Sequence, residues 1–505
     1  MQEIVATINS YVWSSALVYL CLGVGLFFSV MTRFVQVRQI GEMFRLLARG
    51  KSSSEGISTF QALAVSLSGR VGTGNIAGVA AAIGFGGPGA VFWMWVVAFL
   101  GASTAYVESA LGQIYKEVDD GQYRGGPAFY IEKALGQKWY AWIFALTTVL
   151  ATGFLLPGVQ ANAIGNAVDL AVGGGALIES PFGEVSQAKL IVGSTVVVFL
   201  GIIIFGGVKR IAHFTQYVVP IMALAYIISA LVIIIMNISA VPGIIAMIVD
   251  DAFTPMAGFG AAIGWGVKRG VYSNEAGQGT GPHAASAAEV EHPAQQGLVQ
   301  AFSVYVDTLL VCSATAFMIL ITGAYHVTGV DGAVSGGSLA MTVDPNSPAF
   351  TQLAVESVVS GVGGPFVAIA LFFFAFTTLL AYYYIAETNV AYIKRTFHIP
   401  GLMLILKLGL MAAVFYGAIR TASLAWGLGD IGVGLMAWLN IIGILIIFLA
   451  GKPAIKALRD YESQQAEGVK KYSFDPKALG IKNAGFWEQR IIQERSDAKA
   501  DRQSD

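Results

Sequence analysis

The sequence predicts an all-α polytopic membrane protein with about eleven transmembrane helices. Of its 505 residues, 55% are hydrophobic and only 12% are charged, whereas soluble domains carry about 25% charged residues. A chain of this length accommodates ten or more spans of about 20 residues each. The net charge of −1 excludes the strongly basic surface that nucleic-acid binding requires.

Eleven apolar runs are the candidate spans. They cover residues 11–31, 58–84, 88–115, 139–164, 187–208, 213–237, 256–280, 297–323, 363–391, 402–420 and 431–450. The first run lacks a basic segment before it and a clear cleavage site after it. We therefore expect a retained span there and not a removed signal peptide.

Loop charge alternates along the chain. Lys and Arg residues occupy the loops after the first, third, fifth and ninth runs and the start of the tail, whereas the loops 165–186, 238–255 and 324–362 contain none. Arg420 is the one exception on the uncharged side. Because basic loops stay in the cytoplasm, we expect the N-terminus outside and the C-terminus in the cytoplasm. Residues 346–361 are expected to form a short surface helix.

Two glycine-rich polar segments, residues 66–89 and 258–282, interrupt this apolar pattern. Gly destabilises a helix by about 1 kcal/mol per residue, and unwound backbone at membrane depth is tolerated only where it is buried or lines a cavity. Each segment is therefore expected to be a discontinuous helix, and the second is expected to break at 264–266. Two interrupted helices at corresponding positions are typical of inverted-repeat transporters.

This pattern divides the chain into four parts. Residues 1–57 form a peripheral transmembrane helix and a basic cytoplasmic segment, 58–240 the first five-helix repeat, 241–452 the second repeat of opposite topology, and 453–505 a partly helical cytoplasmic tail. A broken helix offers N–H groups and a positive dipole end to a carboxylate, and free carbonyls to a cation. The segment from Ser68 to Asn75 is the expected site of an ion and a small solute.

Several stretches resemble the alanine or glycine:cation symporter family. They are GRVGTGNIAGVAAAIGFGGPGAVFWMW, RGGPAFYIEKALG, GVQANAI, SNEAGQGTGP with HPAQQG downstream, and FAFTTLLAYYYIAETN. The resemblance covers residues 10–455 and implies the leucine-transporter-type fold, with ten core helices in inverted repeats and an extra helix before them. It also implies sodium-coupled uptake of alanine or glycine, by a multi-pass protein of the bacterial plasma membrane.

The resemblance implies roles for the residues of the first break. The N–H groups of Thr73 and Gly74 would hold the substrate carboxylate, and the carbonyls of Ser68 and Val71 would face sodium. Asn75 would either brace the unwound loop or touch the ligand.

The ninth span supplies the other half of the implied sodium site. Thr377 and Thr378 would contribute hydroxyl oxygens and Phe374 its carbonyl, with Thr378 also near the substrate. Without the resemblance, hydroxyls bonded to carbonyls one turn earlier explain the Thr pair as well. Ala381 and Tyr382 stand where much of the family has a Gly and a Trp, and this departure leaves serine or glutamine as alternative substrates for a site that Tyr382 lines.

Gln160, Trp265 and Arg70 each have two interpretations. Gln160 either touches the substrate or forms an interhelical hydrogen bond, because an unpaired amide at membrane depth is costly. Trp265, with Gly264 beside it at the expected break, either packs in the core or covers the site as a lid.

Arg70 either binds the substrate carboxylate or has a structural role, which is the favoured interpretation. In that role it satisfies carbonyls freed by the break or pairs with Glu108 or Glu387. Lys268 and Arg269 are expected to point toward the cytoplasmic side.

The remaining reactive side chains give no competing site. Cys21 and Cys312 both lie in apolar runs and are expected to be free core residues. His283 and His292 lack the spacing of metal ligands and are expected in a cytosolic connection. No cofactor is expected besides the coupling ion.

Three alternative functions stay open. Glu108, Asp307 and Glu387 are candidates for a proton relay, which would replace sodium by a proton. A sensor or channel of the same fold would keep the solute site without coupled transport. An intramembrane enzyme would need a nucleophile–base pair or a metal cluster, and the sequence shows neither. The expected partners are a small amino acid, Na⁺ and the bilayer, with no nucleic acid; a monomer is compatible with the sequence.

Overall fold

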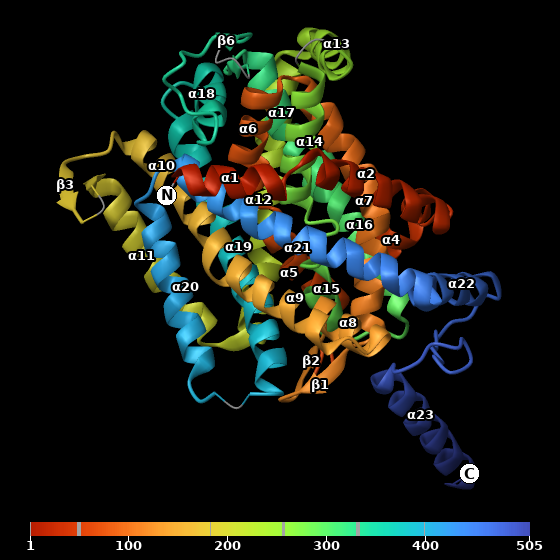
Figure 1. The fold of residues 1–505 in the computed structure, drawn as a ribbon. Coiled ribbons are helices and arrows are strands. Elements are labelled where there is room, and N and C mark those ends of the chain that lie inside the picture. Colours follow the sequence, from red (N-terminus) through yellow and green to blue (C-terminus); the bar gives the residue numbers. More distant parts are fainter. Residues whose placement is uncertain are drawn as a thin grey trace.

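The computed structural model describes residues 2–47, 52–181, 183–254, 258–329, 334–397 and 399–504. These residues form a bundle of helices with three short two-stranded hairpins (Figure 1). Helices α13 and α18 lie at one end of the bundle, hereafter the α18 end. The hairpin β1–β2 and the C-terminal helix lie at the opposite end, hereafter the β1 end (Figure 1). The all-α prediction is confirmed.

The first half of the chain runs through the following elements. They are α1 (Gln2–Val12), α2 (Ser15–Met31), α3 (Val35–Arg38), α4 (Ile40–Leu47), α5 (Thr59–Arg70), η1 (Gly74–Gly78), α6 (Val79–Gly86), α7 (Gly89–Ile114), β1 (Glu117–Asp119), β2 (Gln122–Arg124), α8 (Pro127–Leu135), α9 (Lys138–Leu150), η2 (Ala151–Leu155), α10 (Leu156–Val172), β3 (Leu177–Ser180), β4 (Gly183–Ser186), α11 (Gln187–Ile204) and α12 (Gly207–Met236). The segments η1 and η2 are π-helical turns.

The second half continues in the same way. Its elements are η3 (Ile238–Ala240), α13 (Val241–Ala252), α14 (Gly258–Asn274), α15 (Gly281–Ala287), α16 (Pro293–Val304), η4 (Tyr305–Cys312), α17 (Ser313–Thr322), β5 (Val327–Thr328), β6 (Val334–Ser335), α18 (Ala349–Val358), α19 (Gly363–Lys394), α20 (Leu402–Ala418), α21 (Ala422–Gly451), α22 (Pro453–Ala466) and α23 (Gly485–Ser504). The segment η4 is π-helical, and α18 confirms the short helix expected at 346–361.

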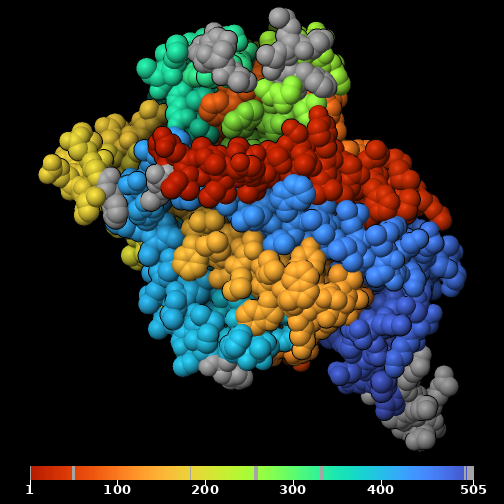
Figure 2. All heavy atoms as spheres, in the orientation of Figure 1, coloured from red at the N-terminus to blue at the C-terminus, as the bar shows by residue number. Residues whose placement is uncertain are grey.

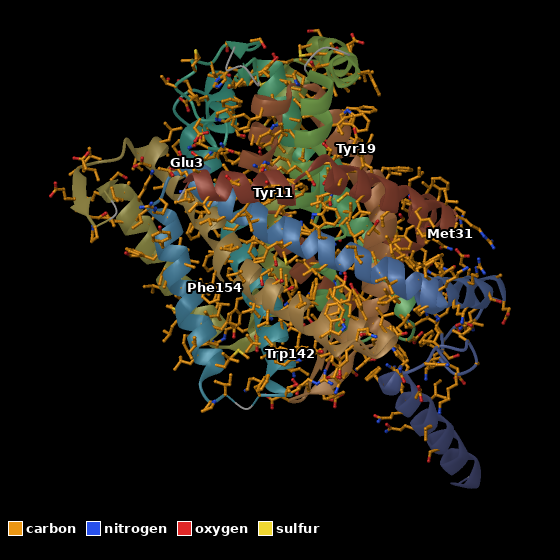
Figure 3. All side chains as sticks on the ribbon, in the orientation of Figure 1. Glu3, Tyr11, Tyr19, Met31, Trp142 and Phe154 are labelled. Carbon is orange, nitrogen blue, oxygen red and sulfur yellow. The ribbon has the colours of Figure 1, made fainter. Side chains whose placement is uncertain are left out.

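The helices have the length and surface of a membrane bundle. Seven described stretches are long and apolar enough to cross a membrane, and α1 with α2, bent by 41°, makes an eighth. The segment Gly74–Gly86 and helix α20 are shorter apolar helices. Large apolar side chains are exposed on the outside, among them Tyr11, Tyr19 and Phe154 (Figure 3). Such a surface is typical of contact with lipid.

The first helix pair is peripheral, as expected. Helices α1 and α2 cross one face of the bundle beside α21 (Figure 2). The Asn9 amide donates to the Gly427 carbonyl at 2.8 Å, and Trp13 Nε1 donates to the Asp430 carbonyl at 2.8 Å. Both cysteines are buried and free, as predicted.

The first discontinuous helix is confirmed, and its break is shorter than the glycine-rich stretch. Ser58 begins α5 with a capping box, in which its hydroxyl accepts a hydrogen bond from the N–H of Gln61 at 3.2 Å. Helix α5 ends at Arg70, where Val71 turns away with φ −77° and ψ 86°. Gly72 is a bend, and helical structure resumes directly afterwards.

The second helix is also discontinuous, but the expected break at 264–266 is wrong. Helix α14 runs without interruption through these residues, and the break lies at 275–280. Glu275, Gly277 and Gly279 have φ values of 59°, 87° and 81°. This left-handed conformation ends a right-handed helix.

Close packing explains the glycine at the centre of the expected break. A Cβ atom on Gly266 would overlap the backbone of Ala90 and the side chain of Trp93. Gly266 therefore lets α14 and α7 approach each other and does not mark a break. Gly264 has no heavy atom within 4 Å of its Cβ position.

The stretch around the two histidines, expected to be a cytosolic connection, is mostly helical and buried. His283 lies in α15, the second half of the broken helix, and is fully buried. His292 is buried as the N-cap of α16, where its Nδ1 accepts a hydrogen bond from the N–H of Ala294 at 3.1 Å. The polar composition of this stretch reflects an unwound, buried backbone.

The tail is partly helical, as expected, and part of it packs on the β1 end. The Trp487 indole is buried and donates a hydrogen bond to the Gln113 carbonyl at 2.8 Å. Lys116 Nζ lies 4.0 Å from the ring centre of Tyr123 and 5.5 Å from that of Trp487. The indole therefore anchors the end of the chain to the end of α7.

We expect Trp487→Ala to free the tail from the bundle. Loss of a buried indole costs about 3–5 kcal/mol, so proteolysis of residues beyond 466 will be at least tenfold faster in the purified protein. Trp139→Ala is the control, because that side chain is 64% exposed and its loss leaves the tail in place. Equal cleavage rates in the two variants would contradict the anchoring role.

Candidate functional site

The two helix breaks face each other inside the bundle. A Cβ atom on Gly74 would lie only 3.1 Å from the Cα atom of Ser273, in the last turn of α14. Thr73, Asn75 and Asn274 are completely buried. The glycine in the first break is therefore required for the close approach of the second discontinuous helix.

Asn75 braces the first break. Its Oδ1 accepts a hydrogen bond from the N–H of Gly72 at 2.8 Å, and its own N–H donates to the Gly72 carbonyl at 3.2 Å. In a regular helix these two N–H groups would donate to the carbonyls of Ser68 and Val71. Both carbonyls have thus lost their helical partners, which is the condition that the expected sodium site requires.

Gln160 of α10 reaches the same break. Its Oε1 accepts a hydrogen bond from the N–H of Thr73 at 3.0 Å. The Thr73 N–H, which was predicted to bind the substrate carboxylate, is therefore bonded to an amide oxygen in this structure. The Gln160 Nε2 lies 3.5 Å from the Tyr272 hydroxyl, and the Gln160 side chain lies beside Tyr382 of α19. Four helices therefore converge on one polar cluster through Gln160.

The threonine pair of α19 is divided between two neighbours. The Thr378 hydroxyl lies against the first break, because a Cβ atom on Gly72 would overlap it. The Thr377 hydroxyl faces Met222 of α12, with Oγ1 3.8 Å from Sδ. Both hydroxyls donate to the Phe374 carbonyl, at 2.9 Å for Thr378 and 3.0 Å for Thr377. Thr378 is thus the member of the pair that meets the expected site.

Arg70 has the structural contacts that were favoured. Its Nη1 donates to the Gln300 carbonyl at 3.1 Å and to the Gln300 Oε1 at 3.3 Å. Among the described residues no acid lies within 4.0 Å of its guanidinium. The expected pairs with Glu108 and Glu387 are therefore wrong, and Glu387 pairs instead with Arg124 at 3.6 Å.

Glu108 of α7 closes the second break. Its two carboxylate oxygens accept hydrogen bonds from the N–H groups of Gly277 and Gly279, at 3.3 and 3.2 Å, and one of them from the Asn440 amide at 2.7 Å. The carboxylate replaces the helical carbonyls that these donors lack. The sequence interpretation weighed Glu108 for proton transfer and as a partner of Arg70, and missed this role.

Asp307 joins the two breaks to η4. Its Oδ1 accepts hydrogen bonds from Asn75 at 2.7 Å and from the Ser273 hydroxyl at 3.0 Å, and its Oδ2 accepts one from Thr308 at 2.7 Å. Carboxylate, amide and hydroxyl oxygens are suitable ligands for a hard cation. The sequence did signal Asp307, because it is a charged residue in an apolar run. Its partners Asn75 and Ser273 could not be recognised, because they lie far from it along the chain.

Trp265 packs against α6, the helix that follows the first break. Its ring stacks on Phe85, with 4.7 Å between the ring centres. Lys268 and Arg269 follow on the same helix and bind Asp430 of α21, at 2.7 and 2.8 Å. They lie buried or half-buried within the bundle, so the expectation that they point to the cytoplasmic side is wrong.

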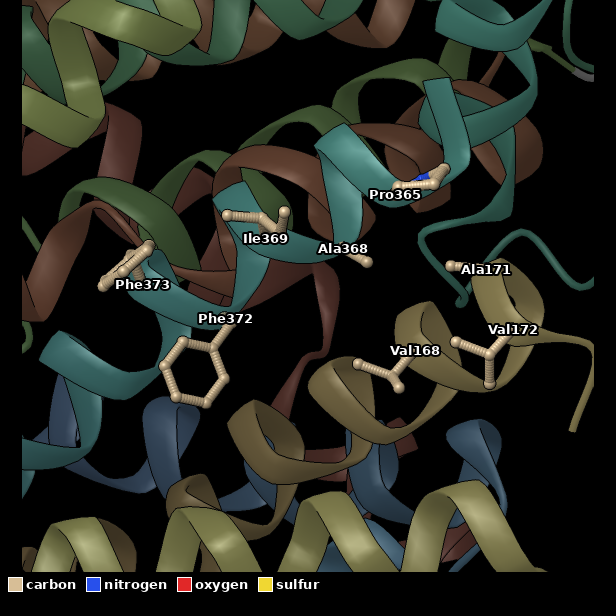
Figure 4. A pocket seen from close by; sticks show the side chains of 8 residues that line it. All are labelled: Val168, Ala171, Val172, Pro365, Ala368, Ile369, Phe372 and Phe373. Carbon is tan, nitrogen blue, oxygen red and sulfur yellow. The ribbon is translucent and has the colours of Figure 1, made fainter. Parts of the chain in front are cut away.

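A separate apolar pocket lies between α10 and α19 (Figure 4). It is lined by Val168, Ala171, Val172, Pro365, Ala368, Ile369, Phe372 and Phe373. All of these side chains are apolar. A charged solute needs polar partners, so this pocket is no candidate for a zwitterion.

The fold and the facing breaks define the class of the protein. The chain is similar to the crystal structure of MhsT in complex with L-phenylalanine, with a TM-score of 0.50 and 16% sequence identity over 79% of this chain and 100% of that chain. Discontinuous helices that meet at a buried polar site are the mark of secondary transporters with inverted repeats. The protein is a transporter with the leucine-transporter-type fold.

Sequence comparison gives the family. The model of the sodium:alanine symporter family matches residues 1–476, and the chain belongs to that family. A protein of Bacillus subtilis (strain 168), named "Putative sodium/proton-dependent alanine carrier protein YrbD", is 56% identical over 98% of this chain and 99% of its own. The sodium/proton-dependent alanine carrier protein of Bacillus sp. (strain PS3) is 48% identical over 88% of this chain and 97% of its own. The probable sodium/glutamine symporter GlnT of Bacillus subtilis (strain 168) is 40% identical over 93% and 92%.

Proposed function

We propose that this chain carries out sodium-coupled symport of a small neutral amino acid, alanine or glycine, into the cytoplasm by alternating access. The observation that carries the proposal is the pair of facing breaks, in which the carbonyls of Ser68 and Val71 lie free of helical partners and Thr378 lies against Gly72. The names of the alanine-carrier relatives support the choice of solute and ion. The sodium gradient supplies the work, at about 2.3 kcal/mol per charge and 100 mV.

Each predicted residue has a role in this proposal. Na⁺ binds to the carbonyls of Ser68, Val71 and Phe374 and to the hydroxyl of Thr378, and the Thr377 hydroxyl joins them after it rotates away from Met222. The substrate carboxylate binds to the N–H groups of Thr73 and Gly74, and the remaining contacts come from Asn75, Gln160, Gly264, Trp265, Thr378 and Tyr382. The amide of Gln160, which accepts from Thr73, gives way to the substrate carboxylate. The N-terminus lies outside the plasma membrane and the tail lies in the cytoplasm, because basic loops stay on the cytoplasmic side.

Uptake into liposomes tests the proposal. Labelled alanine, glycine, serine and glutamine are offered to the reconstituted protein with Na⁺ or with choline outside. We expect alanine or glycine to accumulate only with Na⁺. If no amino acid accumulates with Na⁺, the proposal is refuted. If glutamine alone accumulates, the substrate is glutamine, as in the name of the relative GlnT.

We expect Thr378→Ala to raise the Na⁺ concentration for half-maximal uptake roughly tenfold, because loss of one ion ligand worth about 1.4 kcal/mol changes an affinity tenfold. The ranking of amino acids will change less. Sodium titration of uptake is the measurement. Thr388→Ala is the matched control, because this threonine lies on the same helix with its hydroxyl bonded to the Tyr384 carbonyl in the same way, at 2.9 Å. An altered substrate ranking at unchanged Na⁺ affinity would contradict the assignment.

A further inference from the structure

The half-helices of the two breaks are tied together at the β1 end. Helix α5 begins at Thr59 and α15 ends at Ala287, and the residues that flank them pair as in a parallel sheet. The N–H of Ile57 donates to the Ala287 carbonyl at 2.9 Å, and the N–H of Glu289 donates to the Ile57 carbonyl at 2.8 Å. Residues 288–292, hereafter the link, continue from α15 to α16. Movement of α15 at this end therefore requires movement of the link.

The C-terminal tail binds the middle of the link. Arg490 Nη1 donates to Oε1 of Glu289 at 2.8 Å and to the Val290 carbonyl at 3.1 Å. The N–H of Tyr472 donates to Oε2 of Glu291 at 3.0 Å. Two separate stretches of the tail therefore bind three consecutive residues of the link.

The tail also encloses the last residue of the link, His292. This side chain is completely buried, and its ring centre lies 5.1 Å from that of Tyr461 and 5.0 Å from that of Phe474. Because its Nδ1 accepts from the N–H of Ala294, its Nε2 carries the hydrogen and donates it to Oδ2 of Asp460 at 3.0 Å. Both the ring and its polar edge thus have partners in the tail.

The first residue of the link binds a lysine that the tail covers. Lys116, which follows α7, is completely buried, and its Nζ donates to the Ala288 carbonyl at 2.9 Å. The same ammonium lies 4.5 Å from the ring centre of Phe486 and 5.5 Å from that of Trp487. A cation is attracted to the face of an aromatic ring at such distances. The end of α7, the link and the tail therefore share one buried charge.

We propose that the tail is a clamp on the link: it holds α15 against α5 and α7 and slows opening of the transporter at the β1 end. This inference rests on the proposed symport function, in which the β1 end faces the cytoplasm. When α15 moves away from α5, the bonds between link and tail break, so their loss is part of the barrier to opening. These tail contacts involve none of the residues assigned to sodium or to the substrate. Release of the tail therefore speeds opening and leaves both sites in place.

Thiol labelling of the purified full chain measures opening at the β1 end. Ala284→Cys places a thiol in α15, at a position that is 4% exposed and lines a small cavity between α5, α15 and α19. A maleimide reaches this thiol when α15 separates from α5. We expect Trp487→Ala to raise the labelling rate of Ala284→Cys at least tenfold. The labelling of the chain without Ala284→Cys is subtracted, because Cys21 and Cys312 are free thiols.

Lys477→Ala is the matched control within the tail. Lys477 pairs with Glu488 of the tail at 3.3 Å, so its loss leaves the link contacts in place and the labelling rate unchanged. Ala354→Cys is the control for the rest of the bundle, because Ala354 is completely buried in α18 at the opposite end. Its labelling rate is expected to be the same with and without Trp487→Ala.

A second variant keeps the test decisive if Trp487→Ala does not fold. Arg490→Ala removes the bonds to Glu289 and Val290 and is expected to raise the labelling rate of Ala284→Cys at least twofold. Unchanged labelling in both tail variants overturns the inference. Equal acceleration at Ala284→Cys and Ala354→Cys overturns it as well, since that result shows a general loosening of the bundle.

Uptake of labelled alanine by the unchanged protein separates this inference from the function on which it rests. Sodium-driven uptake together with unchanged labelling in the tail variants refutes the clamp and leaves symport intact. Sodium-driven uptake that persists in Trp487→Ala, together with faster labelling of Ala284→Cys, supports the clamp. Absence of sodium-driven uptake in the unchanged protein refutes symport, and the inference with it.

Discussion

Gly72→Ala is expected to abolish amino-acid uptake. A Cβ atom at this position would overlap the Thr378 hydroxyl and would lie 3.0 Å from Gln160 Oε1. Neither neighbour can retreat easily, because Thr378 is bonded to the Phe374 carbonyl and Gln160 to the N–H of Thr73. Displacement of a binding group by about 1 Å lowers the rate about a hundredfold, so the rate of uptake will fall by at least that factor.

Reconstituted uptake of labelled alanine with a sodium gradient is the measurement. Gly23→Ala is the control, because Gly23 lies in α2 and has no heavy atom within 4 Å of its Cβ position. That variant adds the same methyl group to a helix and is expected to transport normally. Transport by Gly72→Ala at more than a tenth of the unchanged rate would exclude Gly72 and Thr378 from the site.

Asp430→Ala is expected to produce the largest loss of stability. Asp430 binds Arg269 at 2.8 Å and Lys268 at 2.7 Å, and Arg269 is only 1% exposed. Removal of one partner leaves a buried guanidinium without its counter-charge, at a cost of about 3–5 kcal/mol. The Arg269 guanidinium lies 4.1 Å from the ring centre of Trp426, and this contact offsets only part of the loss.

Denaturant unfolding of the purified protein in detergent measures this effect as a lower free energy of unfolding. The control is Glu462→Ala, which removes the acid from an ion pair with Arg38 at 2.7 Å, in which the Arg38 side chain is 39% exposed. An exposed pair contributes about 0–1 kcal/mol. Equal losses in the two variants would show that the Asp430 cluster contributes no more than a surface pair.

Hydropathy predicted the helices because it is a local signal. Each apolar run maps onto a helix or a helix pair, and the polar glycine cluster around Gly72 marked the first break correctly. The second break was misplaced because glycine serves two different purposes in such a run. It either lets two helices pack closely or adopts the left-handed backbone that ends a helix. Gly266 provides room for Ala90, whereas Gly277 and Gly279 provide left-handed backbone. The residue that begins the break, Glu275, is no glycine, so composition gave little warning.

The site was predicted less completely because its contacts join distant parts of the chain. Asn75 and Asp307 are 232 positions apart, and Gln160 and Thr73 are 87 apart. The sequence indicated that Asn75 and Gln160 are polar residues at membrane depth that need partners. It contained no information on which buried acid or amide would meet them, since that depends on how α7, α10 and η4 pack.

The π-helical turn η2 has a consequence for aligning this chain with its relatives. Residues 151–155 accommodate one extra residue within a single turn, and Gln160 follows five positions later. One residue corresponds to about 100° of helix rotation. A one-residue gap placed in this turn would therefore turn the Gln160 amide away from Thr73 and toward another helix. An insertion or deletion between 151 and 155 would therefore change the partners of Gln160, which lies outside the turn.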